Sequence, residues 1–198
     1  MMQLHQNSNL LPMPSPEVSQ PFEQALTQGK AGESLLSKWL QNRGHDVFPA
    51  YKVEMEAAKG PQLFTRDGQF VLPDFLAFRD GKAIWFEAKT KSRFTWHRQS
   101  ERWTTGLDLR HYKEYLQVSE RTRLPVVLLF WHPCGNPSPA DLNHGCPAAC
   151  PTGLFSGQLN ILRTRYSHIS NKWGNSGMIY WDVSALHKIA ERAEVEAL

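Results

Sequence analysis

The spacing of apolar residues predicts a helix over residues 31–43. Leu36, Trp39 and Leu40 recur at helical intervals, and Gly44 follows as a typical helix stop. Runs rich in β-branched and aromatic residues come next, and they predict three strands that should form an antiparallel meander. These strands are expected over 47–54, 69–78 and 83–91.

The second half of the chain begins with a helix over 108–121, which places Leu109, Tyr112 and Leu116 on one face. Pro125 ends that helix before the apolar strand "VVLLFWH". Many Pro and Gly residues and all three cysteines predict one long irregular insertion over 133–157. We then expect strands near 158–166 and 177–183 and a closing helix from Ser184.

This order of elements predicts an α/β fold with a mixed sheet flanked by helices and an antiparallel portion. Residues 1–21 are polar and proline-rich, which favours a flexible tail. A single domain is expected over 22–198, with a Cys/Pro/Gly-rich insertion at 133–157.

Charge is unevenly distributed along the 198 residues. Residues 89–123 hold nine Lys and Arg against four Asp and Glu, a balance of +5, so the rest of the +3 chain carries −2. A local basic region favours an anionic partner, although a solvated charged surface would look the same. The apolar runs are too short to span a bilayer, there is no secretion signal, and three cysteines do not suggest a disulfide framework. We therefore expect an intracellular, cytoplasmic protein without a membrane partner.

Two predicted strands carry charges where a sheet normally has apolar residues. Asp80-Gly81 is a favoured two-residue hairpin turn, and the register that it sets places Asp74 opposite Glu87. Lys89 shares a face with both acids, because alternate residues of a strand point to the same side.

Two acids facing each other between apolar neighbours need compensation, since like charges in opposed positions destabilise a sheet. One solution is a hard divalent cation, and the other is a buried ion pair of Lys89 with one acid while the second acid is protonated. We favour the cation, because buried charges with only a structural role contribute little net stability. Glu33 lies near the core-facing side of the first helix and is a candidate third acid.

These residues resemble the motifs of the PD-(D/E)XK nuclease superfamily. The resemblance consists of Glu33 in "GESLLSKWLQNRG", Pro73-Asp74, and Glu87-Ala88-Lys89, in a helix, three strands, helix, strand order over about residues 30–132. Within the superfamily the pattern looks most like the Holliday junction resolvase-like branch. The resemblance implies a restriction endonuclease-like α-β-β-β-α-β core with C-terminal additions.

The resemblance also implies roles for these residues in a Mg²⁺- or Mn²⁺-dependent deoxyribonuclease, an endonuclease. Asp74 and Glu87 would hold the metal, with the Ala88 carbonyl as a further ligand and Glu33 as an outer or second-metal ligand. Lys89 would orient or help to deprotonate the attacking water. His111 and Tyr112 stand where related enzymes often keep a polar residue, frequently Gln; this chain departs from that pattern, and a surface histidine is the favoured interpretation of His111. A resolvase acts as a dimer, so a homodimer is also implied.

The stretch "TKSRFTWHRQSERWTTG" follows the expected active-site strand and interleaves basic with aromatic residues. Such residues can contact phosphates and stack on bases, so we expect a mobile arm over DNA. The alternative is a loop packed by its own tryptophans. The candidate DNA-binding residues are Lys91, Arg93, Trp96, Arg98 and Arg102.

The cysteine-rich insertion offers enough nitrogen and sulfur donors for a structural zinc site. The candidate ligands are Cys134, His144, Cys146 and Cys150, together with His132. Free buried cysteines are a common alternative.

Two other functions fit the same motifs. One is a nucleic-acid-binding protein on a nuclease fold whose chemistry has lapsed, although the intact Asp, Glu and Lys argue against it. The other is a restriction or recombination nuclease of the same superfamily, because the fold alone does not choose among them.

Overall fold

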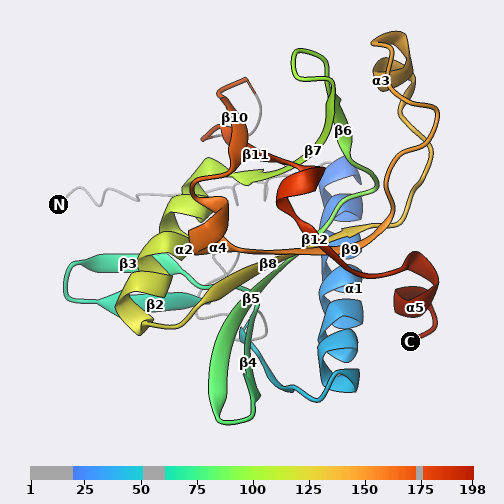
Figure 1. Cartoon of the computed structure of the whole chain (residues 1–198). Helices are drawn as coiled ribbons and strands as arrows, with labels where there is room; N and C mark the ends of the chain where they lie inside the picture. The colour runs from blue at the N-terminus through green and yellow to red at the C-terminus, as the bar shows by residue number, and fades with distance from the viewer. Residues whose placement is uncertain (1–19, 51–60, 173–175) are drawn as a thin grey trace, which may run out of the picture.

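The computed structural model describes residues 20–50, 61–172 and 176–198. It shows a mixed α/β fold with a central six-stranded sheet flanked by helices (Figure 1). The strand order is β1-β4-β5-β8-β9-β12. In that order the strands span Asp46–Pro49, Phe75–Arg79, Lys82–Thr90, Val126–His132, Gly153–Gln158 and His187–Ala190.

The sheet is mixed because β5 and β8 run parallel, whereas the other neighbouring strands run antiparallel. Strands β1, β4 and β5 form the predicted antiparallel meander. The parallel pair is connected by α2 (Leu109–Thr122), with Asp108 as its N-cap, which confirms the helix and the strand predicted for this part of the chain.

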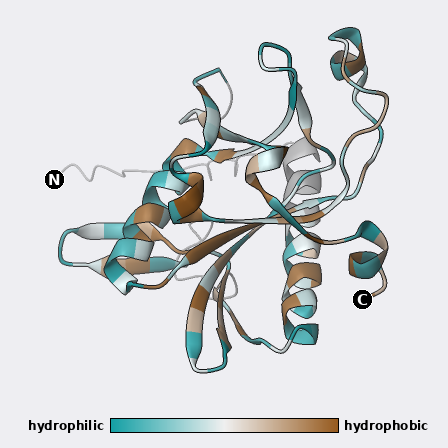
Figure 2. Cartoon of the chain, viewed as in Figure 1, coloured by the Kyte–Doolittle hydropathy of each residue, from teal (hydrophilic) through white to brown (hydrophobic). Residues whose placement is uncertain are grey.

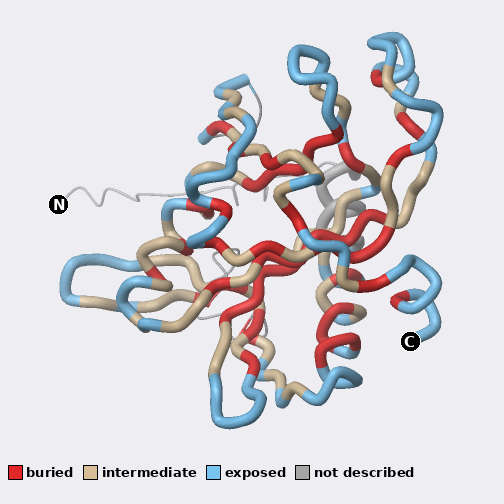
Figure 3. The backbone as a smooth tube through the Cα atoms, viewed as in Figure 1, coloured by how far each residue is buried: buried red, intermediate tan, exposed pale blue. Residues whose placement is uncertain are grey.

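Helices cover both faces of the sheet. On one face α1 (Gln20–Asn42) packs Leu36, Trp39 and Leu40 against buried residues of β4, β5 and β8. On the other face α2 packs against Trp85 of β5 and its neighbours. Buried residues follow the central strands and the inward sides of the helices, where apolar residues also gather (Figures 2 and 3).

Three further groups of strands and helices surround this core. A second sheet has the order β10-β11-β7-β6, and β2 and β3 form a hairpin whose β3 strand lies against α2. The strands of the second sheet span Tyr166–Ser170, Met178–Asp182, Arg102–Asp108 and Thr95–His97, and the hairpin spans Gln62–Thr65 and Gly68–Val71. The short helices are α3 (Pro139–Asn143), α4 (Leu159–Leu162), α5 (Arg192–Glu196) and the 3₁₀ turn η2 (Val183–Ala185). None of the helices that the structure describes is both long enough and apolar enough to cross a membrane.

Several predicted boundaries are wrong in the first half of the chain. The first helix begins at Gln20, so it includes the last two residues of the expected tail, whose residues 1–19 lie outside the described part. The strand expected over 47–54 ends at Pro49, and 51–60 are likewise outside it. The strand expected over 69–78 is two strands in different sheets, β3 and β4, because Pro73 interrupts the pairing.

The C-terminal part differs more. The irregular insertion ends before Gly153, where β9 begins, because Leu154 and Phe155 are buried in the central sheet. The strand expected over 158–166 is α4 followed by a turn, and β10 begins only at Tyr166. The strand expected near 177–183 is confirmed as β11. In place of a closing helix from Ser184 the chain forms η2, β12 and the short α5.

Gly32 allows α1 to approach β5 beside the charged strand residues. A Cβ atom at this position would lie 1.8 Å from the Thr90 hydroxyl oxygen and 2.8 Å from its Cβ. Helix and strand therefore approach more closely than any side chain at position 32 would permit, and this approach fixes the position of neighbouring Glu33.

We predict that Gly32→Ala destabilises the protein by about 1–3 kcal/mol, because the added methyl group overpacks against Thr90. Gly29→Ala in the same helix is the matched control, since a Cβ there meets nothing within 4 Å. That control should gain up to about 1 kcal/mol from helix propensity. Chemical denaturation of both variants tests this, and equal stabilities would contradict the close approach.

Candidate active site

The β4–β5 hairpin brings Asp74 to Glu87 in the predicted register. Ladder pairs run from Arg79 with Lys82 to Phe75 with Phe86. Asp74 lies one residue beyond the ladder, and its Oδ2 accepts a hydrogen bond of 2.8 Å from the backbone N–H of Ala88. This bond attaches Asp74 to β5 between Glu87 and Lys89, so the three residues of the motif converge.

Glu87 is fully buried, and its carboxylate is poorly satisfied. The Lys89 ammonium lies 2.5 Å from Oε1 as an ion pair, and the Tyr115 hydroxyl interacts with the same carboxylate. These two partners leave the fully buried carboxylate with fewer hydrogen bonds than its two oxygens could accept. A buried carboxylate in this state is costly unless a further partner binds it.

Three acids concentrate negative charge at this point. Burial, then Glu87, raises the pKa of Asp74 well above its usual value, and Lys89 and the Ala88 N–H only partly oppose this. The pKa of half-buried Glu33 is also raised, first by burial and then by Glu87, while Lys89 and Lys30 lower it. Glu33 therefore lies within electrostatic range of the other two acids, as its place on the first helix suggested.

The carboxylates keep Lys89 protonated. Burial alone would lower its pKa, but Glu87, Asp74 and Glu33 together raise the pKa above the usual lysine value. With Lys89 paired to Glu87 and the pKa of Asp74 raised, the described residues adopt the ion-pair arrangement that was the alternative to a bound cation. In these surroundings Lys89 is a cationic donor and not a neutral base.

Helix α2 contributes two residues that the sequence did not clearly identify. His111 is half-buried, and its ring stacks on Tyr115 with 5.9 Å between centroids. Burial and Lys89 lower the pKa of His111, against opposing effects of Glu87 and Asp108. Burial and the charges of Glu87 and Asp74 raise the pKa of Tyr115. Tyr112 instead faces the core and contacts Trp181. The four-residue spacing of His111 and Tyr115, which places both on one face of a helix, is the sequence pattern that could have identified them as a pair.

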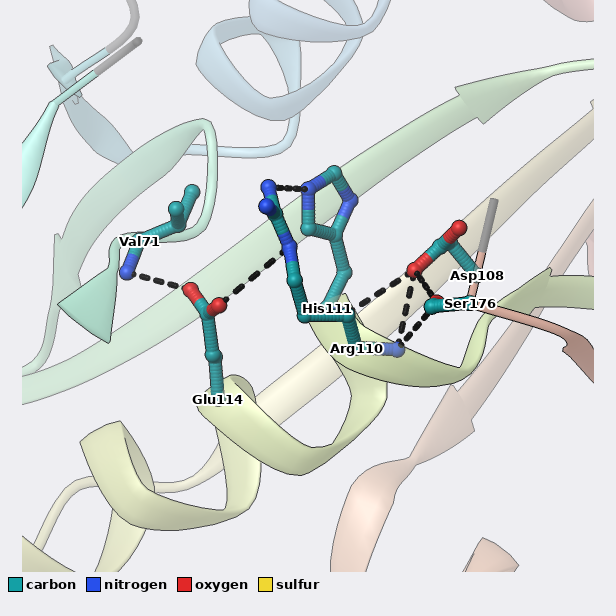
Figure 4. Close-up of polar contacts among 6 residues, drawn as sticks. All are labelled: Val71, Asp108, Arg110, His111, Glu114 and Ser176. Atoms are coloured by element: carbon teal, nitrogen blue, oxygen red, sulfur yellow. Dashed lines mark hydrogen bonds and ion pairs between the residues drawn. The ribbon is translucent and has the colours of Figure 1, made fainter. Parts of the chain in front are cut away.

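The first turn of α2 is held firmly in place (Figure 4). The Asp108 side chain accepts hydrogen bonds from the backbone N–H of Arg110 at 2.8 Å and from the Ser176 hydroxyl at 2.6 Å. Glu114 pairs with Arg110 at 3.4 Å and accepts from the Val71 N–H at 2.7 Å.

Arg110 also touches the His111 ring at its Nε2, at 3.4 Å. A guanidinium group can only donate, so this contact favours the His111 tautomer with its proton on Nδ1. The orientation of the imidazole is thus supported from outside the acidic cluster.

The basic and aromatic segment is a β-hairpin and not an irregular arm. Strands β6 and β7 pair within the second sheet, and Phe94, just before β6, is fully buried. The Trp96 ring packs on Trp103 at 5.2 Å, so the tryptophans serve mainly to pack the hairpin, as the alternative proposed.

The four basic candidates of this segment have different surroundings. Arg93 donates to the Asn136 carbonyl at 2.7 Å, and Arg102 lies 3.9 Å from the Asp182 carboxylate. Arg98 is exposed in the hairpin turn. Lys91 is half-buried and lies just past the end of β5, two residues after Lys89.

The candidate zinc ligands are not gathered into one site. Cys134, Cys146 and Cys150 are free thiols; the first donates to the Asn136 carbonyl and the last to the Phe94 carbonyl. His144 is exposed, whereas His132 is buried in the core. Across 20–50, 61–172 and 176–198 there is no group of three or more His, Cys, Asp or Glu side chains placed to hold a metal. Structural zinc thus stays a prediction that elemental analysis of the pure protein can test.

The insertion is tied down by hydrogen bonds instead. Ser138 and Asp141 form a capping box at the start of α3, and the Asp141 carboxylate accepts from the Trp96 N–H of β6 at 3.0 Å. This contact fastens the insertion to the edge of the second sheet.

The acidic cluster itself fits a hard divalent cation such as Mg²⁺ or Mn²⁺. Carboxylate oxygens are the ligands that such ions prefer, and Asp74 and Glu87 place two carboxylates together beside one lysine. The lack of a ready group of three side chains does not argue against Mg²⁺, because this ion is commonly held by one or two carboxylates with waters and substrate phosphates. Such an ion stays a prediction: Asp74, Glu87 and the Ala88 carbonyl would hold it, and Glu33 lies within electrostatic range of the two acids.

No protein-family model matches this chain, and no curated protein does either. Among solved structures, the chain is similar to that of Hjc, a Holliday junction resolvase from the archaeal hyperthermophile Archaeoglobus fulgidus. The two share 9% sequence identity with a TM-score of 0.47, over 84% of this chain and 99% of that one. At this level the similarity carries no argument about function, which has to rest on the site.

We predict that Asp74→Asn raises the stability of the protein in a chelating buffer by about 0.5–2 kcal/mol, because an amide keeps the bond to Ala88 and removes repulsion from Glu87. Exposed Asp46 provides the control, and Asp46→Asn should change stability by less than about 0.5 kcal/mol. Thermal unfolding in EDTA measures both. A loss of stability in Asp74→Asn would show that the Asp74 charge is needed structurally.

Proposed function

We propose that this chain is a divalent-metal-dependent deoxyribonuclease, an endonuclease of the Holliday junction resolvase-like type. The observation that carries the proposal is the Glu87 carboxylate, fully buried with Lys89 as its ion-pair partner, beside the half-buried Asp74 and within electrostatic range of Glu33. A cluster of buried charges contributes little net stability to a sheet. A functional role therefore explains these acids better than a structural one.

The protein's own residues divide this task among them. A cation bound by the carboxylates would polarise the phosphate and lower the pKa of an attacking water. Lys89, protonated and half-buried, can donate to a phosphate oxygen and stabilise the charge that develops there. Tyr115 holds Glu87 in place from α2, in the manner of residues that orient metal ligands.

His111 is the residue best suited to handle a proton. Its lowered pKa keeps the imidazole neutral near pH 7, and Nε2, the ring nitrogen beside Arg110, is the one that can accept a proton from water.

A second candidate function is DNA binding without cleavage. The observation in its favour is the Lys89–Glu87 ion pair, which already neutralises one acid of the cluster. The two functions differ in one measurable respect, since only the nuclease needs Mg²⁺ to change its substrate.

We expect the purified protein to cleave at least one member of a panel of plasmid, linear and branched DNA when Mg²⁺ or Mn²⁺ is added, and none in EDTA. Asp74→Ala and Lys89→Ala should each lower the cleavage rate by at least about 100-fold, because the first removes a ligand of the proposed cation and the second removes a positive charge that stabilises the reacting phosphate. Circular dichroism would confirm that both variants are folded.

Full activity in both variants would refute the assignment of the site. Binding of the same DNA without any cleavage, at every metal tested, would instead favour the lapsed nuclease. Lys113→Ala, a change of an exposed lysine on α2, is the matched control and should cleave like the unmodified protein.

The β6–β7 hairpin would contact DNA through the exposed Arg98. Each phosphate contact contributes about 0.9 to the slope of log binding constant against log salt concentration. Arg98→Ala should reduce that slope by about this amount, whereas Lys82→Ala, in the exposed turn of the β4–β5 hairpin, should leave it unchanged. Fluorescence anisotropy at several salt concentrations measures the slope, and an unaltered slope in Arg98→Ala would exclude this contact.

A further inference from the structure

Strand β5 presents a second lysine on the face that carries Glu87 and Lys89. The backbone N–H of Lys91 donates to the Trp131 carbonyl at 3.0 Å, so pairing with β8 continues beyond Thr90, the last residue of the ladder. Alternate residues of a strand share a face, which places Lys91 one repeat beyond Lys89, about 6.6 Å further along the strand. The two lysines therefore form a row that leads away from the acids.

The two lysines have opposite electrostatic surroundings. Lys89 is paired with Glu87, but among the residues that the structure describes no carboxylate forms an ion pair with Lys91. Burial first, and then the charge of Lys89, lower the pKa of Lys91 to about 8. An ammonium group in this position has lost part of its hydration and has gained no counter-charge from the protein.

The neighbour of Lys91 on β8 cannot supply that counter-charge. His132 is fully buried, and neither ring nitrogen has a hydrogen bond with full geometry, although the backbone of Arg93 approaches the ring. Burial, and then Lys91, lower the pKa of His132 to about 3, so the imidazole is neutral. Its ring stacks on Phe94 with 3.9 Å between centroids. Together these rings give Lys91 an apolar surrounding that strengthens any electrostatic interaction made there.

A purely structural role does not explain this arrangement. A half-buried cation without a partner costs stability, and a methionine of similar shape would fill the same space without that cost. The side chain is not fully buried, so an external anion can reach it. The chemistry that fits is a phosphate, which brings the missing negative charge.

We propose that Lys91 binds the phosphate next to the one that is hydrolysed, on a substrate strand that continues past the acids along β5. The inference rests on the proposed nuclease function and specifies its substrate: a polynucleotide with a charged phosphate flanking the scissile position. Lys91 would then be a specificity-determining residue, while Lys89 acts on the scissile phosphate.

The test combines one change in the protein with one change in the DNA. In an oligonucleotide with a mapped cleavage site, each flanking phosphate is replaced in turn by a neutral methylphosphonate. For one flanking position we expect this change to weaken substrate binding by the unmodified protein about 10-fold or more, as the loss of a charge-assisted hydrogen bond does. Lys91→Met should bind the unmodified oligonucleotide equally weakly and should be insensitive to that methylphosphonate.

Single-turnover kinetics separate this role from catalysis. The half-saturating concentration should rise in Lys91→Met, while the maximal cleavage rate should change less than twofold. The matched control is Lys113→Met, which removes an exposed lysine of α2 and should respond to the methylphosphonate as the unmodified protein does. If Lys91→Met and the unmodified protein lose the same factor on every neutralised phosphate, the inference is wrong and the nuclease assignment stands. If the unmodified protein neither binds nor cleaves DNA, the proposed function fails and the inference fails with it.

Thermal unfolding provides an independent readout that does not depend on DNA. Because the lowered pKa makes the charged form of Lys91 costly in the folded state, Lys91→Met should raise Tm at pH 7. Above about pH 8 Lys91 becomes neutral in the folded protein, and above about pH 10 it is neutral in the unfolded chain as well. The gain in Tm should therefore shrink as the pH rises from 8 toward 10. A fall in Tm at pH 7 would identify Lys91 as a structural cation and would overturn the inference.

Discussion

The burial of one carboxylate, that of Glu87, is the constraint on which the rest of the site depends. This side chain enters the apolar interior between the central sheet and α2, where a charge is costly. Its surroundings reduce the cost only in part. Lys89 supplies the positive charge from the same strand, and Tyr115 approaches from α2. Two further acids, Asp74 and Glu33, raise the local negative potential. Fold stability alone would select against this combination, so it points to a ligand that the carboxylates bind.

The sequence could predict the part of this site that depends on local chemistry. Asp80 and Gly81 both adopt positive φ, the conformation that a tight hairpin turn demands, and the register between β4 and β5 follows from that turn. The strand period then places Lys89, without any knowledge of the rest of the fold. Pro73 also predicts the break between β3 and β4, because it has no N–H to donate to a strand ladder. The single strand expected over 69–78 did not take this into account.

The parts that the sequence did not predict depend on contacts between distant segments. Phe94 and Trp103 read equally well as exposed stacking residues or as core residues. Only the packing of Phe94 on His132 and Phe155, and of Trp103 on Trp96, decides that they are buried. The glycines of β9 resemble those of a loop until the strand is placed between β8 and β12. His111 and Tyr115 share a helix face at four-residue spacing, but the sequence does not show what that face contacts. Only the three-dimensional packing brings it to the charged residues of β5.

Lys89 and Lys91 show why burial alone does not determine what a lysine does. They lie two residues apart on one face of one strand, and burial lowers the pKa of each. For Lys89 the nearby carboxylates outweigh that effect and raise its pKa. For Lys91 the nearest charged group is Lys89 itself, and the neighbouring His132 is neutral, so nothing in the described part of the protein compensates its charge. The paired Lys89 should therefore attract an external anion less strongly than the unpaired Lys91, which follows it along the chain. On this proposal a polynucleotide would be bound most strongly at Lys91, where no carboxylate competes for the ammonium group. The phosphate that reacts would lie beside the acids and Lys89.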